Sequence, residues 1–166
     1  SNIVVINGSE ITRDMPPGHS NAIFIKDANK LITDDSIDAY REARKQEAFI
    51  FWNHPYRASH SPDASVPLSQ IHKILIAEGL IEGIEIVNDT TFSNEALQLA
   101  FDFNLIILGT SDIHGIVNWQ YRISLGGHRP VTLVFDRKKA KRSLKKALQA
   151  GHTVFCFKYN FIRKKK

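Results

Sequence analysis

An aspartate and a histidine two positions apart, Asp112 and His114, are the residues of this chain most suited to chemistry. They follow an apolar run over residues 105–108 that reads as a buried strand, after which the chain turns to small residues. In an extended segment, residues i and i+2 point to the same side. A carboxylate and an imidazole placed in this way suit a divalent metal such as zinc, manganese or iron.

Polar groups also follow other apolar runs. Glu10 comes shortly after the first run, His54 follows the run that ends at Trp52, and Asn88 follows the run that ends at Val87. In parallel α/β folds, ligands gather at the carboxyl ends of the strands. We therefore expect these side chains to meet Asp112 and His114 at one edge of a sheet.

The elements that must position these groups alternate along the chain, which predicts a single α/β domain over residues 1–166 with a basic tail at 160–166. Near-continuous apolar strands favour a mostly parallel sheet. The predicted strands cover residues 3–6, 22–25, 48–52, 81–87, 106–108, 131–135 and 153–157. The predicted helices cover residues 36–46, 67–78 and 94–103, with Ser93 as a cap, and a last basic helix is closed by Gly151.

Composition narrows the class of protein. The 166 residues are 43% hydrophobic and 23% charged, and Cys156 is the only cysteine, which excludes an intrachain disulfide. No apolar run approaches the length of about 20 residues that spans a bilayer, so we expect a soluble protein without a membrane segment. The localisation stays open between the cytoplasm and, if an upstream signal was removed, the periplasm or the exterior.

The formal net charge of +5 comes largely from lysines and arginines in residues 137–146 and 163–166. Such a distribution can attract nucleic acid. The sequence has no glycine-rich phosphate loop, RNP-like aromatic pattern or zinc-finger spacing, so we interpret the basic residues as a solvated helix face and a frayed end. A nucleic-acid-binding module is kept as a rival.

Five short motifs follow one another along the chain: GSEIT at 8–12, GHSNAI at 18–23, WNHP at 52–55, GIEIVN at 83–88 and GTSDIH at 109–114. In these motifs the chain resembles the PHP family (polymerase and histidinol phosphatase), metal-dependent phosphoesterases with a distorted β/α barrel. The order and approximate spacing of the motifs agree over nearly the whole chain, and residues 10–19 look especially like bacterial phosphoesterases or phosphodiesterases of the family.

The resemblance implies a site for up to three divalent ions, zinc, manganese or iron. Glu10 resembles the carboxylate that bridges two ions, and His19 and His54 resemble the histidines that bind one of them. Asp112 resembles a ligand of a second ion and His114 of a third. Such ions activate water for attack on a phosphate mono- or diester, so a phosphorylated small molecule is the implied substrate.

The chain departs from the family because it has no His-x-His strand, which supplies further ligands in PHP proteins. Against the family pattern, we expect the chain to begin partway round the barrel, as a truncated or proteolytic fragment, as a natural shortened paralogue, or as a chain whose missing portion another chain supplies. We therefore expect an incomplete barrel that self-associates through exposed strand edges, with at most one well-held ion, at Glu10, His19 and His54.

The sequence also suggests roles in catalysis, phosphate binding or packing for individual polar residues. Glu10, His54 and Arg13 are the catalytic candidates, and Arg13, Asn53 and Arg57 the candidates for binding substrate phosphate. Glu85 lies within a strand and is expected to be a buried, paired acid or a supporting partner of a metal ligand, with the structural role favoured. The histidines that fit no ligand position are expected on the surface or in loops, namely His60, His72, His128 and His152.

Two further interpretations stay open beside a phosphoesterase. One is a non-catalytic PHP-like protein that binds metal or a partner. The other is an amidohydrolase-like barrel, which uses the same kinds of ligand and whose usual early His-x-His is equally missing.

Overall fold

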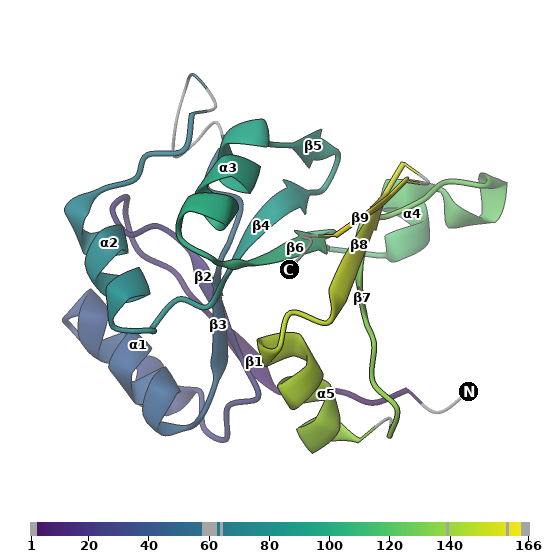
Figure 1. Ribbon diagram of the computed structural model, residues 1–166. Coiled ribbons are helices and arrows are strands. Elements are labelled where there is room, and N and C mark those ends of the chain that lie inside the picture. The colour runs from purple at the N-terminus through teal and green to yellow at the C-terminus, as the bar shows by residue number, and fades with distance from the viewer. Residues whose placement is uncertain (1–2, 58–62, 64, 139, 159, 164–166) are drawn as a thin grey trace.

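The computed structural model describes residues 3–57, 63, 65–138, 140–158 and 160–163. Its larger sheet has six strands, in which β1 to β4 follow one another and β4 also pairs with β5 and β6. Figure 1 shows this sheet running through the middle of the molecule. The strands are β1 (Gly8–Ile11), β2 (Ser20–Ile23), β3 (Phe49–Trp52), β4 (Gly83–Asn88), β5 (Thr91–Phe92) and β6 (Ile106–Thr110).

Three helices lie together on one side of this sheet (Figure 1): α1 (Ser36–Lys45), α2 (Gln70–Ala77) and α3 (Asn94–Asp102). Helix α1 begins where the Asp35 carboxylate accepts hydrogen bonds from two backbone N–H groups, and the Ser93 hydroxyl caps α3 as predicted. The main hydrophobic core lies beneath these helices and includes fully buried Ile50 and Trp52 of β3.

A second, three-stranded sheet and helix α5 lie on the other side (Figure 1). Phe49 and Phe51, which alternate with the core residues of β3, form a smaller apolar cluster with Leu108 and with Leu148 of α5. The elements of this part are α4 (Val117–Tyr121), β7 (Val131–Val134), α5 (Lys141–Gln149), β8 (Thr153–Phe157) and β9 (Asn160–Ile162), and the short 3₁₀ helices are η1 (Asn29–Leu31) and η2 (Ile123–Leu125).

One hydroxyl group joins the two sheets. The Thr132 Oγ1 atom in β7 accepts a hydrogen bond from the Gly109 N–H in β6 and donates one to the Gly109 carbonyl, each at 2.9 Å. Because this contact fixes the backbone of β6 near its carboxyl end, it also fixes the start of the loop that carries Asp112 and His114.

The α/β class is confirmed, but the prediction of mostly parallel strands is wrong. Only β3–β4 and β4–β6 are parallel pairs among the described residues, and the other five strand pairs are antiparallel. The segments between β1 and β2 and between β4 and β5 contain no helix, and such short connections favour antiparallel neighbours. The six-stranded sheet does not close over the described part of the chain, so the expected barrel is not confirmed.

Several element boundaries differ from the predictions. Residues 3–6, expected as a buried strand, form none, and Ile3 and Val5 are 84% and 71% exposed. The expected basic tail starts with strand β9, while residues 164–166 lie outside the described residues. None of the described helices is long and apolar enough to cross a membrane.

Candidate metal centre

Three predicted metal ligands meet at one edge of the larger sheet: Glu10 in β1, His19 just before β2 and His54 just after β3. One ligand atom from each lies within 4.8 Å of the other two. The strand register explains the meeting, because Glu10 pairs with Asn21 across β1–β2 and Ser20 pairs with Trp52 across β2–β3. Residues far apart in the sequence are therefore neighbours at this edge.

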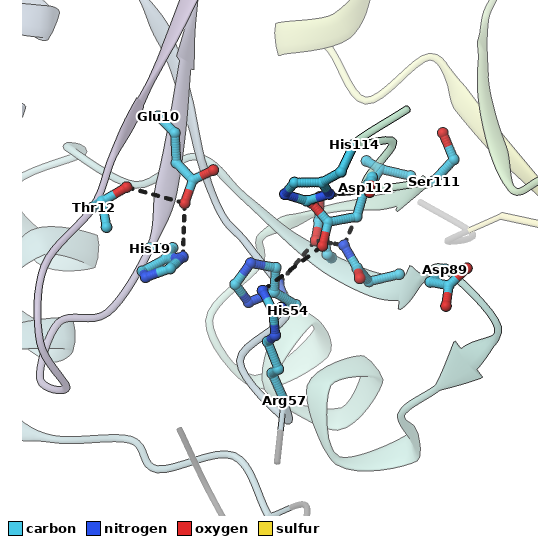
Figure 2. Close-up of polar contacts among 12 residues, drawn as sticks. Glu10, Thr12, His19, His54, Arg57, Asp89, Ser111, Asp112 and His114 are labelled. Atoms are coloured by element: carbon cyan, nitrogen blue, oxygen red, sulfur yellow. Dashed lines mark hydrogen bonds and ion pairs between the residues drawn. The ribbon is translucent and has the colours of Figure 1, made fainter. Parts of the chain in front are cut away.

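Glu10 and His19 are in direct contact in the cluster (Figure 2). The Nδ1 atom of His19 lies 2.7 Å from Oε1 of Glu10, and the Thr12 hydroxyl donates to the same oxygen at 3.2 Å. The rings of His19 and His54 meet edge to face, with centroids 5.1 Å apart. Two imidazoles and a carboxylate are the ligand set of some catalytic zinc sites, so the cluster fits a divalent ion with a coordination position left for water.

His54, the most buried residue of this cluster, is held in an uncommon backbone conformation. Its φ is +25°, its exposed fraction is 2%, and its backbone N–H donates to Oε2 of Glu85 at 2.8 Å. Burial, with the nearby His19 as a smaller cause, lowers the pKa of the His54 imidazole, although the Asp112 carboxylate opposes this shift. A lowered pKa favours the neutral imidazole that metal binding requires.

Asp112 and His114 lie on the other side of His54 from Glu10 and His19 (Figure 2). The cluster of ligand atoms within the described residues does not include either of them. The His114 side chain is 75% exposed, and its Nδ1 atom lies 2.7 Å from the backbone carbonyl of Asp112. The predicted pair therefore stands next to the three-ligand cluster, with the His114 ring against its own loop.

Glu85 connects the ends of three neighbouring strands although it is not among the clustered ligands. Besides the His54 N–H, its carboxylate accepts hydrogen bonds from Nδ2 of Asn88 at 2.9 Å and from the Thr110 hydroxyl at 2.6 Å. Burial is the largest cause that raises the pKa of Glu85, to about 7, and the hydrogen bonds act in the opposite direction. Glu85 is thus the buried, paired acid that the sequence indicates.

The three candidates for phosphate binding have different surroundings. Arg57 is half exposed, and its Nη1 atom lies 3.9 Å from Oδ2 of Asp112. Arg13 donates from Nη2 to the Thr33 carbonyl at 2.7 Å. Asn53 is only 3% exposed, and its Oδ1 atom accepts from the Asn21 N–H at 3.2 Å. Arg57 is therefore the most accessible of the three, and the substrate-binding role of each stays a prediction.

The expectation that His72 lies on the surface or in a loop is wrong, whereas His60 lies outside the described residues. His72 in α2 is fully buried, and its ring stacks on Trp52 with centroids 3.9 Å apart. Its Nε2 atom lies 2.9 Å from the Pro17 carbonyl, two residues before His19. His72 therefore supports the loop that carries a ligand, and no local motif in the sequence marks this contact.

The sequence also does not reveal the contacts of Tyr121 that hold the residue before Asp112. The hydroxyl of Tyr121 in α4 lies 2.7 Å from both Oδ1 of Asp89 and the carbonyl of Ser111, the residue before Asp112. Burial and the Asp89 carboxylate raise the pKa of Tyr121, so the hydroxyl stays protonated as a donor. The only signal in the sequence was a lone tyrosine after a glycine-containing loop, which does not specify a partner.

A solved structure is similar to this chain over nearly its whole length. The chain is similar to a two-domain protein from Bacteroides vulgatus that is described as containing a predicted PHP-like metal-dependent phosphoesterase. The two share 42% sequence identity and a TM-score of 0.93, over 98% of this chain and 47% of that protein. The chain thus spans about half the length of that relative.

Two other comparisons give no relative. No protein-family model matches the chain, and no curated protein matches it. The similarity to the solved structure, together with the clustered Glu10, His19 and His54, supports the resemblance of this chain to the PHP family.

Proposed function

We propose that this chain is a metal-dependent phosphoesterase that hydrolyses a phosphate mono- or diester. The observation that carries the proposal is the meeting of Glu10, His19 and His54, whose ligand atoms lie within 4.8 Å of one another. The similarity to a protein with a PHP-like metal-dependent phosphoesterase supports the choice of phosphate esters as the substrate class.

Glu10, His19 and His54 would hold the ion, and zinc, manganese and iron all accept such ligands. When bound, a divalent ion in such a site lowers the pKa of water and polarises a phosphoryl oxygen. Glu10 already contacts His19, so little rearrangement is needed to aim both ligands at one point. The nearly complete burial of His54 shields that ligand from solvent on one side.

Substrate would approach from the side of Asp112 and Arg57. The guanidinium of Arg57 is half exposed, and its contact with Asp112 among the described residues is long, at 3.9 Å, so it can turn to a phosphate oxygen. Arg13 is already engaged by the Thr33 carbonyl, and we assign it the role of holding the loop between Glu10 and His19.

Asp112 and His114 would bind further ions more weakly than the three-ligand cluster. Neither belongs to a group of three clustered ligand atoms among the described residues, and the His114 ring contacts the backbone of its own loop. We therefore propose a single well-held ion for this chain.

Hydrolysis of 4-nitrophenyl phosphate and bis(4-nitrophenyl) phosphate with added zinc, manganese or iron(II) tests the proposal. We expect metal-dependent release of nitrophenol that is lost in His54→Ala and retained in His152→Ala, because His152 is an exposed histidine outside the cluster. Metal binding without hydrolysis of either ester would favour the non-catalytic alternative. Hydrolysis of an aryl amide in place of both esters would favour an amidohydrolase-like activity.

A further inference from the structure

Glu85 is an acid of this region for which the proposed reaction has no direct use. It is 1% exposed, and its three hydrogen-bond donors come from three segments: the His54 N–H after β3, Asn88 at the end of β4 and Thr110 at the end of β6. Such a carboxylate ties the ends of three adjacent strands together at the edge where the ligands meet.

The contact with His54 sets the direction of a ligand. A non-glycine residue at a φ of +25° persists only where its surroundings determine the conformation. The peptide of His54 is fixed on both sides, because Glu85 accepts from its N–H at 2.8 Å and its carbonyl accepts from the Arg57 N–H at 2.9 Å. Releasing the N–H would allow the backbone to relax and the imidazole to turn away from Glu10 and His19.

We propose that Glu85 is a positioning residue of the metal centre, which acts through the backbone of His54 and does not touch the ion. The proposal rests on the proposed function in one respect, namely that Glu10, His19 and His54 bind the ion. The contribution of Glu85 is its reach to the His54 N–H rather than its negative charge.

Two substitutions separate reach from charge. Glu85→Gln keeps a carbonyl oxygen for the N–H of His54 and the amide of Asn88, and its own amide can donate to the Thr110 hydroxyl, which turns to accept. Glu85→Asp keeps the acid but is one methylene shorter, so it cannot hold the His54 N–H and the Thr110 hydroxyl together.

Glu82, just before β4, supplies a matched control. It is a glutamate less buried than Glu85 that makes an ion pair with Arg44 at 3.2 Å and accepts a hydrogen bond from Gln149 at 3.2 Å, and neither partner is a predicted metal ligand. Glu82→Asp should therefore alter stability without altering metal affinity.

The experiment is a zinc titration of the full chain against a chromophoric chelator, with the visible absorption of bound cobalt(II) as a second readout. We expect Glu85→Asp to lose about 10- to 100-fold in affinity, with a changed cobalt spectrum, as is typical when a group that orients a ligand is altered. Glu85→Gln and Glu82→Asp should bind metal as the unmodified chain does. Melting temperatures measured on the metal-free variants separate loss of stability from loss of affinity.

Two results would overturn the positioning role alone. They are unchanged affinity in Glu85→Asp, whatever its melting temperature, and an equal loss in Glu85→Gln and Glu85→Asp, which would indicate that the charge matters. Absence of metal binding by the unmodified chain would instead overturn the proposed site, and this inference with it.

Discussion

His19 Nδ1 lies 2.7 Å from Glu10 Oε1, a contact between the residue that precedes β2 and a residue within β1. The antiparallel register of β1 and β2 produces this contact, and the pairing of β2 with β3 brings His54 beside them. Two strand pairings of the backbone thus assemble a ligand set that is dispersed in the sequence.

The first prediction concerns the number of ions. We expect the chain to bind a single divalent ion tightly, because only Glu10, His19 and His54 cluster among the described residues. His19→Ala should abolish tight binding, and His152→Ala should not. Metal analysis of protein prepared without chelator measures the stoichiometry, and full occupancy at three sites would contradict the account.

The second prediction concerns the pH dependence of stability. Burial lowers the pKa of His72 below its ordinary value of 6.5, so the folded state binds fewer protons than the unfolded state just below that pH. The Ser69 N–H donates to Nδ1 of His72 and leaves Nε2 to donate to the Pro17 carbonyl, which is the neutral form. The contribution of His72 to the free energy of unfolding should therefore be constant above pH 6.5 and should fall as the pH drops through that value.

Urea unfolding of metal-free protein between about pH 8 and about pH 5 measures this effect. His72→Gln should reduce the loss of stability on acidification, whereas the exposed-site variant His152→Gln should leave it unchanged. An identical pH dependence in His72→Gln and the unmodified chain would show that His72 is not buried in its neutral form.

The third prediction separates two arginines. Arg57→Ala should leave the free energy of unfolding within about 0.5 kcal/mol, because it removes an exposed side chain, and should raise KM for an aryl phosphate. Arg13→Ala should cost about 1 kcal/mol of stability through its lost bond to the Thr33 carbonyl. Urea unfolding and steady-state kinetics give both quantities, and an unchanged KM in Arg57→Ala would remove Arg57 from the substrate site.

The fourth prediction concerns the contact between the two sheets. A Cβ atom on Gly109 of β6 would lie 2.9 Å from Cβ of Phe155 in β8, so Gly109→Ala should destabilise the protein by about 1–3 kcal/mol. Gly115→Ala is the control, since a Cβ atom there meets nothing within 4 Å. Equal unfolding free energies for the two variants would mean that β6 and β8 are not packed this closely.

The sequence predicts the parts of the fold that depend on local patterns. Helices α1 and α3 lie within one residue of their predicted ends, because their apolar periodicity and their caps at Asp35 and Ser93 are local signals. The direction of strand pairing is not local. An apolar strand such as β3 reads the same whether its neighbours are parallel or antiparallel, and it has one of each, so the alternation of strands and helices suggested too many parallel pairs.

The candidate site also has parts that the sequence predicts and parts that depend on contacts between distant segments. Glu10, His19 and His54 could be named because their motifs resemble those of a family, and the structure brings them together. The contacts of Glu85 with the His54 backbone and of His72 with Pro17 depend on tertiary packing between distant segments. No spacing in the sequence encodes such contacts, so these supporting residues became visible only in the structure.

The central claim is that Glu10, His19 and His54 bind a divalent ion. The most direct measurement is anomalous diffraction at the zinc absorption edge from crystals of zinc-loaded protein. The account predicts an anomalous peak for a zinc ion that is coordinated by Glu10, His19 and Nδ1 or Nε2 of His54. This peak should be absent from crystals of His54→Ala. A fully loaded crystal with no peak among these three side chains would contradict it.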